Sequence, residues 1–168
     1  VTYQPSHGIL YVCGFMAATL INFRIDKCKG HGLVLDNGTI TNRTYLRRLG
    51  GVTISDGVIQ DCLGHAIKCG GDNENTNRPF RISIVNIDMF RCALTSGIRL
   101  RNTCVYFYAS NSIIDRCAFN GYTYNTGSFP TGIGQGPTTI SGLTLSGRSI
   151  QVTNSRFIDV LNYCVNVL

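Results

Sequence analysis

The sequence predicts an all-β fold in which short parallel strands stack as a solenoid. Composition is the first observation: 43% of the residues are hydrophobic, only 14% are charged, and the chain contains 19 glycines. The apolar residues are mostly β-branched or aromatic, which favours strands over helices. The second observation is a short motif that recurs along most of the chain, and such internal repetition is typical of solenoids.

The recurring motif starts with Asn or Asp, has an apolar residue three positions later and ends six positions later, usually with a cysteine. Four copies end at Cys28, Cys62, Cys92 and Cys117, and a fifth copy has Val160 instead. Apolar-x-apolar segments precede and follow the motif. Three short strands per copy, joined by bends, describe one triangular rung of a solenoid.

Stacked rungs bring like residues together, because successive strands pair about 4.8 Å apart around a shared core. The motif therefore predicts three ladders of side chains. The first lies at a bend and holds Asn22, Asp56, Asn86, Asn111 and Asn154. The second points inward and holds Cys28, Cys62, Cys92, Cys117 and Val160. The third mixes both signs of charge and holds Lys27, Asp61, Arg91, Arg116 and Asp159.

This succession of an apolar-x-apolar strand, Asn, Cys and then Gly-Ile-x-Leu resembles the right-handed parallel β-helices of the pectate-lyase-like superfamily, especially bacteriophage tailspike and capsule depolymerase proteins. The resemblance covers nearly the whole chain. It implies one β-helix domain over residues 1–168, with about five to six rungs and no visible caps. Because the chain starts within a rung at Val1 and stops within a strand at Leu168, we expect a piece of a longer protein.

The cysteines of successive motifs are 34, 30 and 25 residues apart, so the spacing is irregular although the motif is regular. This combination predicts loops inserted at one corner of the solenoid, at 36–51, 70–81 and 125–149. Loops on one side of a repeat scaffold usually form its binding wall. We therefore expect the functional site at this corner.

The resemblance also implies a function. A tailspike-type chain binds and depolymerises a bacterial surface polysaccharide, as a hydrolase or a lyase, without a cofactor. It assembles as a homotrimer and belongs to a virion tail after synthesis in the bacterial cytoplasm. Two alternatives stay open: a non-catalytic structural or receptor-binding segment of a tail appendage, and a secreted bacterial polysaccharide lyase or epimerase.

Charge limits the classes of partner. The chain carries 15 Lys and Arg against 9 Asp and Glu, a net charge of +6, which favours an anionic partner. The resemblance selects an acidic polysaccharide rather than nucleic acid. No run of about 18 apolar residues is present, so we expect no insertion into a membrane.

Basic residues gather on the last strand of two adjacent rungs. Alternation along these strands sends Lys68, Arg99 and Arg101 outward, and stacking is expected to place Lys68 and Arg99 one strand spacing apart. We predict that this face binds the polysaccharide, together with the loop residues Arg47 and Arg48. An ordinary solvated face or an internal ion network is the competing interpretation.

Catalytic carboxylates are expected near the same corner. A glycosidase needs two carboxyl groups roughly 5 to 10 Å apart, and Asp36, Asp72 and Glu74 are the candidates. A lyase would instead combine a base with a cation that neutralises the uronate, and Lys68, Arg99 and Arg101 could supply the cation. Alternatively, Asp72 and Glu74 simply solvate a polar loop.

Histidines occupy one position of the repeat, directly before the last strand. His31 and His65 either form a stacked ladder at a bend or line the sugar groove, and they are included among the predicted binding residues. Cys28 with His31 and Cys62 with His65 also resemble a zinc site. Later copies keep the cysteine without the histidine, so we expect no metal and reduced, buried thiols.

Overall fold

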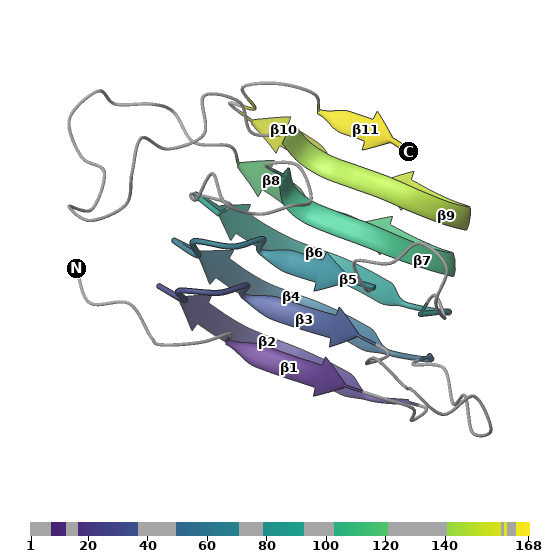
Figure 1. Ribbon diagram of the computed structural model, residues 1–168, viewed down its shortest axis with the longest axis horizontal. Helices are drawn as coiled ribbons and strands as arrows, with labels where there is room; N and C mark the ends of the chain where they lie inside the picture. Colours follow the sequence, from purple (N-terminus) through teal and green to yellow (C-terminus); the bar gives the residue numbers. More distant parts are fainter. Residues whose placement is uncertain are drawn as a thin grey trace.

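In a computed structural model, the described residues are 8–12, 17–36, 50–70, 79–92, 103–120, 141–158, 160 and 164–168, and they form eleven strands and no helix (Figure 1). The first six strands are β1 (Ile9–Val12), β2 (Thr19–Asp26), β3 (Leu33–Asp36), β4 (Thr53–Gln60), β5 (Ile67–Cys69) and β6 (Ser83–Phe90). The other five are β7 (Thr103–Asp115), β8 (Ala118–Asn120), β9 (Ser141–Thr153), β10 (Arg156–Ile158) and β11 (Val165–Val167). The predicted all-β class is confirmed.

All strand pairs are parallel and belong to one strongly curled sheet. Its main path runs β1-β3-β5-β7-β6-β4-β2, while β9 pairs with β7, β10 with β8 and β11 with β9. The long strand β7 closes the curl, because its first part pairs with β5 and its second part with β6. Figure 1 shows β1, β3 and β5 stacked in front of β2, β4 and β6. The arrangement is consistent with a β-solenoid.

The core lies between these two stacks of strands. Burial alternates along β4, where Ile54 and Ile59 are fully buried while Thr53 stays exposed. Facing residues such as Phe107 on β7 and Leu35 on β3 are also fully buried. Each such side chain contributes about 1.5 to 3 kcal/mol when it leaves water. A single repeat cannot bury its apolar side chains alone, and this is why successive repeats stack.

Residues with left-handed backbone mark the bends, and they line up in three rows. The first row is Ala17, Gly51, Arg81, Asn111 and Ser149. The second row is Asn22, Asp56, Asn86, Arg116 and Asn154. The third row, within the described residues, is Lys27, Asp61 and Arg91. Inside each repeat these positions are five residues apart, and Asn and Asp adopt this conformation more readily than most residues.

Many of these bends are followed by a cysteine or a serine whose side chain stabilises the bend. The thiol or hydroxyl of that residue donates a hydrogen bond to the backbone carbonyl of the residue two positions before it. Among the thiols, Cys92 Sγ lies 3.2 Å from Phe90 O, and Cys62 Sγ lies 3.5 Å from Gln60 O. Among the hydroxyls, Ser112 Oγ lies 2.8 Å from Ser110 O. Cysteine and serine thus make the same hydrogen bond to the bend in different repeats.

The predicted ladders are confirmed for the first three copies of the motif. Strands β2, β4 and β6 pair so that Asn22, Asp56 and Asn86 share the second row. In the third row, Arg91 Nη2 donates to Asp61 Oδ2 at 2.7 Å, so this ladder includes an ion pair. The cysteines of these copies, Cys28, Cys62 and Cys92, are buried together in the core.

The fourth copy lies five residues away from its predicted place. Ile84 pairs with Ile114 and Asp88 with Ala118, so Cys117 stands beside Ile87 instead of Cys92. Asn111 belongs to the first row of bends, and Arg116 takes the predicted place of Asn111 in the second row. The prediction was wrong here because a shift of five residues leaves the alternation of inward and outward side chains unchanged. Asp159 of the third ladder lies outside the described residues.

The predicted inserted loops need one correction. Residues 141–149 belong to strand β9, so the third insertion is shorter than the predicted segment 125–149. At the other two insertions, Asp36 ends β3, and Phe80 forms bridges with Gly50 and Ser110. Residues 37–49 and 71–78 of these two segments lie outside the described residues.

Candidate functional site

The predicted basic face is only partly described. Lys68 lies on β5 between the buried residues Ile67 and Cys69 and is itself partly exposed, so its predicted outward direction is confirmed. Its neighbours in the sheet are Val34 on β3 and Tyr106 on β7. Lys68 therefore stacks on Tyr106 and not on Arg99 as predicted, because the strand that follows β5 in the sheet is β7. Arg99 and Arg101 lie outside the described residues.

The histidines form a stacked ladder. The rings of His31 and His65 are 4.9 Å apart and nearly parallel, at 4°. The backbone N–H of His65 donates to His31 Nδ1 at 2.9 Å, and His65 Nδ1 donates to the carbonyl of Thr103 at 2.6 Å. His65 is fully buried, so this side chain cannot contact a polysaccharide in this structure, contrary to the predicted binding role. His31 remains partly exposed.

The same contacts bear on the predicted resemblance to a zinc site. Both Nδ1 atoms, of His31 and His65, are engaged in hydrogen bonds with the backbone. Burial and the neighbouring Cys62 thiol raise the pKa of Cys28 to about 12, which opposes the thiolate that zinc requires. Over the described ranges, no group of three or more His, Cys, Asp or Glu side chains is arranged to hold a metal ion.

The predicted catalytic carboxylates stay untested as a group. Asp36 is the last residue of β3 and pairs with Val12 of β1. Asp72 and Glu74 lie outside the described residues, as do the predicted binding residues Arg47 and Arg48. The catalytic assignment therefore stays a prediction from the sequence.

A different part of the surface is hollowed. An open depression of about 540 Å³ lies where strands β6, β7 and β9 pass the first row of bends. It is lined by Arg81, Ile82, Ser83, Asn111, Ser112, Ile113, Ser149 and Gln151. Most of these side chains are polar and several are exposed. We call this depression the Arg81 hollow.

Two rows of outward side chains build the Arg81 hollow. The first is the row of bends, where Arg81, Asn111 and Ser149 follow one another on three successive repeats. The second lies two residues further along the strands, where Ser83 pairs with Ile113 and Ile113 with Gln151. The hollow therefore repeats the same two positions at each level, about 4.8 Å apart.

A buried hydroxyl fixes the floor of the hollow. Ser112 Oγ donates to Ser110 O at 2.8 Å and accepts a hydrogen bond from the Ile82 backbone N–H at 3.0 Å. The Arg81 backbone N–H donates to Ser110 O at 3.1 Å. These bonds join adjacent repeats directly beneath the exposed side chains, so the lining residues project from a rigid backbone.

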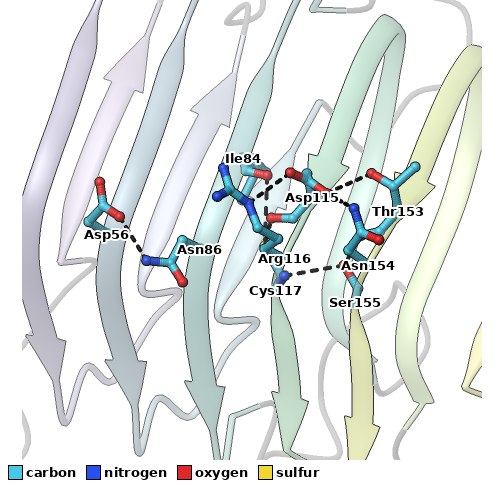
Figure 2. Close-up of polar contacts among 9 residues, drawn as sticks. All are labelled: Asp56, Ile84, Asn86, Asp115, Arg116, Cys117, Thr153, Asn154 and Ser155. Atoms are coloured by element: carbon cyan, nitrogen blue, oxygen red, sulfur yellow. Dashed lines mark hydrogen bonds and ion pairs between the residues drawn. The ribbon is translucent and has the colours of Figure 1, made fainter.

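Carboxylates lie at the second row of bends, Asp115 on β7 and Asp56 on β4 (Figure 2). Asp115 accepts hydrogen bonds from Asn154 Nδ2 at 2.9 Å, from Thr153 Oγ1 at 2.8 Å and from Arg116 Nε at 2.9 Å. The bonds from Asn154 and Thr153, and then Arg116, hold the pKa of Asp115 below its usual range. Hydrogen bonds, first from Asn86, likewise lower the pKa of Asp56. The general acid of a glycosidase needs the opposite shift, a raised pKa. Asp56 and Asp115 therefore suit a structural role as charged hydrogen-bond acceptors better than proton donation.

Sequence reasoning missed the Arg81 hollow because it assigned Asn111 to the wrong row. A five-residue period was the available signal. When each segment is aligned on its left-handed residue, the middle residue points inward and the residues on both sides point outward. The segments are Arg81-Ile82-Ser83, Asn111-Ser112-Ile113 and Ser149-Ile150-Gln151. Aligning by bends rather than by cysteines brings these side chains together.

Comparison with protein-family models, with curated proteins and with solved structures found no match. The family resemblance therefore rests on the sequence pattern. The described residues also contain no helix that is long and apolar enough to cross a membrane.

Proposed function

We propose that this chain is a section of right-handed parallel β-helix of the tailspike type and that it binds a bacterial surface polysaccharide on its outer face. The observation that carries this proposal is the Arg81 hollow. It crosses three successive repeats and presents guanidinium, amide and hydroxyl groups from Arg81, Asn111, Ser149 and Gln151. These are the groups that hydrogen-bond sugar hydroxyls.

The regular stacking favours a polymeric ligand over a small molecule. The same two surface positions recur at each repeat, so a chain of sugar units meets a series of similar hydrogen-bonding groups. Solenoids commonly use such extended surfaces for binding. The depression is open to solvent, which suits a ligand that enters and leaves along its length.

Right-handedness is supported by a general rule. Connections between parallel strands of one sheet are right-handed in roughly 98% of cases. The described strands are all parallel. Neighbouring strands of one stack, such as β2 and β4, are connected along the chain through a strand of the other stack, here β3. The handedness proposed here follows that rule.

Depolymerisation, assembly as a homotrimer and a place in a virion tail extend the proposal through the sequence resemblance. For catalysis the candidate residues remain Asp36, Asp72 and Glu74. An assay for new reducing ends or unsaturated sugar on a bound polysaccharide separates a depolymerase from a binding protein.

The binding proposal is tested by blocking the hollow. Ser83→Tyr places a large ring on an outward position of β6 that lines the depression, and we expect polysaccharide affinity to fall at least about tenfold. Thr53→Tyr is the matched control, because Thr53 pairs with Ser83 in the sheet but does not line the hollow. Binding is measured by biolayer interferometry on immobilised bacterial capsular polysaccharides and lipopolysaccharides. Equal binding by both variants, or no binding by the unmodified protein, would contradict the proposal.

A further inference from the structure

We infer that the ligand of the Arg81 hollow carries a carboxylate, as uronic or sialic acid units do, and that Arg81 binds this group. The inference rests on the proposed polysaccharide binding and deepens it by naming the class of sugar. It depends on the charge of the lining, on the partners that the nearby carboxylate of Asp115 already has and on the geometry of the first row of bends.

The lining carries positive charge with no internal counter-charge. Arg81 is exposed, and none of the eight residues that line the hollow is Asp or Glu. The ion pairs between described residues join Arg91 to Asp61 and Arg116 to Asp115, and neither involves Arg81. Among the described residues, no carboxylate forms an ion pair with the Arg81 guanidinium, which can therefore bind an anion from outside.

The closest carboxylate along the strand from the hollow already has its own partners. Asp115 lies two residues after Ile113 and accepts hydrogen bonds from Arg116, Thr153 and Asn154, as Figure 2 shows. Arg148 adds further positive charge near Arg81, because it is exposed, precedes Ser149 and pairs in the sheet with Ser110. Ser110 in turn accepts the backbone N–H of Arg81. This end of the hollow is thus basic.

The groups beside Arg81 complete a site for an acidic sugar. The planar guanidinium fork of arginine matches the two oxygens of a carboxylate. Asn111 and Ser149 follow Arg81 in the row of bends, and their amide and hydroxyl groups suit the neutral hydroxyls of the same or the next sugar. A neutral polymer offers Arg81 only hydroxyl oxygens as acceptors, whereas a carboxylate supplies acceptors and a counter-charge together, which makes the stronger bond. The hollow therefore favours acidic over neutral polymers.

The test removes the charge and leaves the bend intact. Arg81→Asn suits this purpose because Asn tolerates the left-handed backbone that Arg81 adopts, with φ at 53°. Arg156→Asn is the matched control, because Arg156 is also exposed but lies on β10 outside the hollow. The probes are polygalacturonate, alginate and polysialate, with carboxyl-reduced polygalacturonate as the neutral counterpart and poly(glycerol phosphate) as a different anion.

We expect the protein to bind at least one carboxylated polymer. Arg81→Asn should weaken this binding roughly 10- to 100-fold, the usual effect of losing a hydrogen bond to a charged group. Arg156→Asn should change it less than about twofold, and added salt should weaken the unmodified protein more than Arg81→Asn. The melting temperature of Arg81→Asn should match that of the unmodified protein.

Other results separate the two proposals. Equal affinity for polygalacturonate and its carboxyl-reduced form would overturn the carboxylate inference and leave polysaccharide binding in place. Preference for poly(glycerol phosphate) over every carboxylated polymer would overturn the carboxylate inference in the same way. Failure to bind any polysaccharide in either experiment would overturn both proposals. Equal losses for Arg81→Asn and Arg156→Asn would show that general charge, and not Arg81, is responsible.

Discussion

The N-terminal region, β1 to β6, and the C-terminal region, β7 to β11, are built from the same motif but use it differently. In the first region, β2, β4 and β6 each have eight residues, and like residues of the motif stack directly. In the second, β7 and β9 each have 13 residues and continue through the first row of bends without interruption. The comparison shows that the motif fixes which side chains point inward, whereas the pairing of strands fixes which bend each residue occupies.

The largest expected effect tests whether both regions share one core. Phe107 lies on β7, is fully buried and pairs with Cys69 of the N-terminal region and Leu145 of β9. We expect Phe107→Ala to lower the free energy of unfolding by about 3 to 5 kcal/mol, in a single cooperative denaturant transition. Ile21→Ala is the control, because Ile21 is 52% exposed and should change stability by about 0.5 kcal/mol or less. Two separate transitions would mean that the regions unfold independently.

A smaller effect should distinguish the cysteines of the two regions. Cys92 lies between the thiols of Cys62 and Cys104, whereas the Cys117 backbone N–H donates a hydrogen bond to Ser155 Oγ at 3.2 Å. We expect Cys92→Ser to cost about 1 to 3 kcal/mol, since it buries a hydroxyl among apolar groups and thiols. Cys117→Ser should cost less than about 1 kcal/mol, because Ser155 already holds the equivalent position on the next repeat. Equal costs in thermal or denaturant unfolding would contradict this difference.

The smallest effect concerns pH and the exposed carboxylates of the second row. The pKa of Asp56 and that of Asp115 are both lowered by folding, chiefly through hydrogen bonds from Asn86 and Asn154 respectively. Their contribution to stability is therefore present above the unfolded pKa, about 3.9, and is lost as pH falls through the folded pKa.

Carboxyl carbon NMR titration measures these shifts directly. We expect Asn154→Gly to raise the pKa of Asp115 more than Arg116→Ala does, because the hydrogen bond from Asn154 is the largest cause of the shift. Glycine keeps the left-handed bend, so the change isolates the amide group. A larger shift in Arg116→Ala would assign the main role to the ion pair instead.

The sequence was sufficient for the class of fold and for the N-terminal register. Alternation and repetition identify Ile54, Ile59 and Cys62 as inward residues, and the structure buries all three. The register of the C-terminal region could not be read in the same way. Asn111 and Arg116 both occupy left-handed bends, so the motif fits two positions equally well until the partner strand is known.

The candidate site was harder to predict than the fold. The Arg81 hollow depends on which residues of three separate repeats become neighbours, and this in turn depends on the register of β7. Lys68 and the histidines were predicted as site residues because their side chains can carry charge or transfer protons. Burial of His65 depends on contacts such as that with Thr103, which is 38 residues away and outside the motif.

The five-residue spacing of the bends has a consequence for how the chain reaches its native state. In most sheets a slip by one residue turns every apolar side chain to solvent and is rejected at once. Here a slip by five residues restores the same alternation and offers another bend that Asn or Ser can occupy, so a misaligned repeat still collapses compactly. Such topologies already fold slowly, because their contacts join distant residues. Correct alignment of each new repeat on the last is therefore expected to set the folding time, and misaligned repeats are expected to be the main kinetic traps.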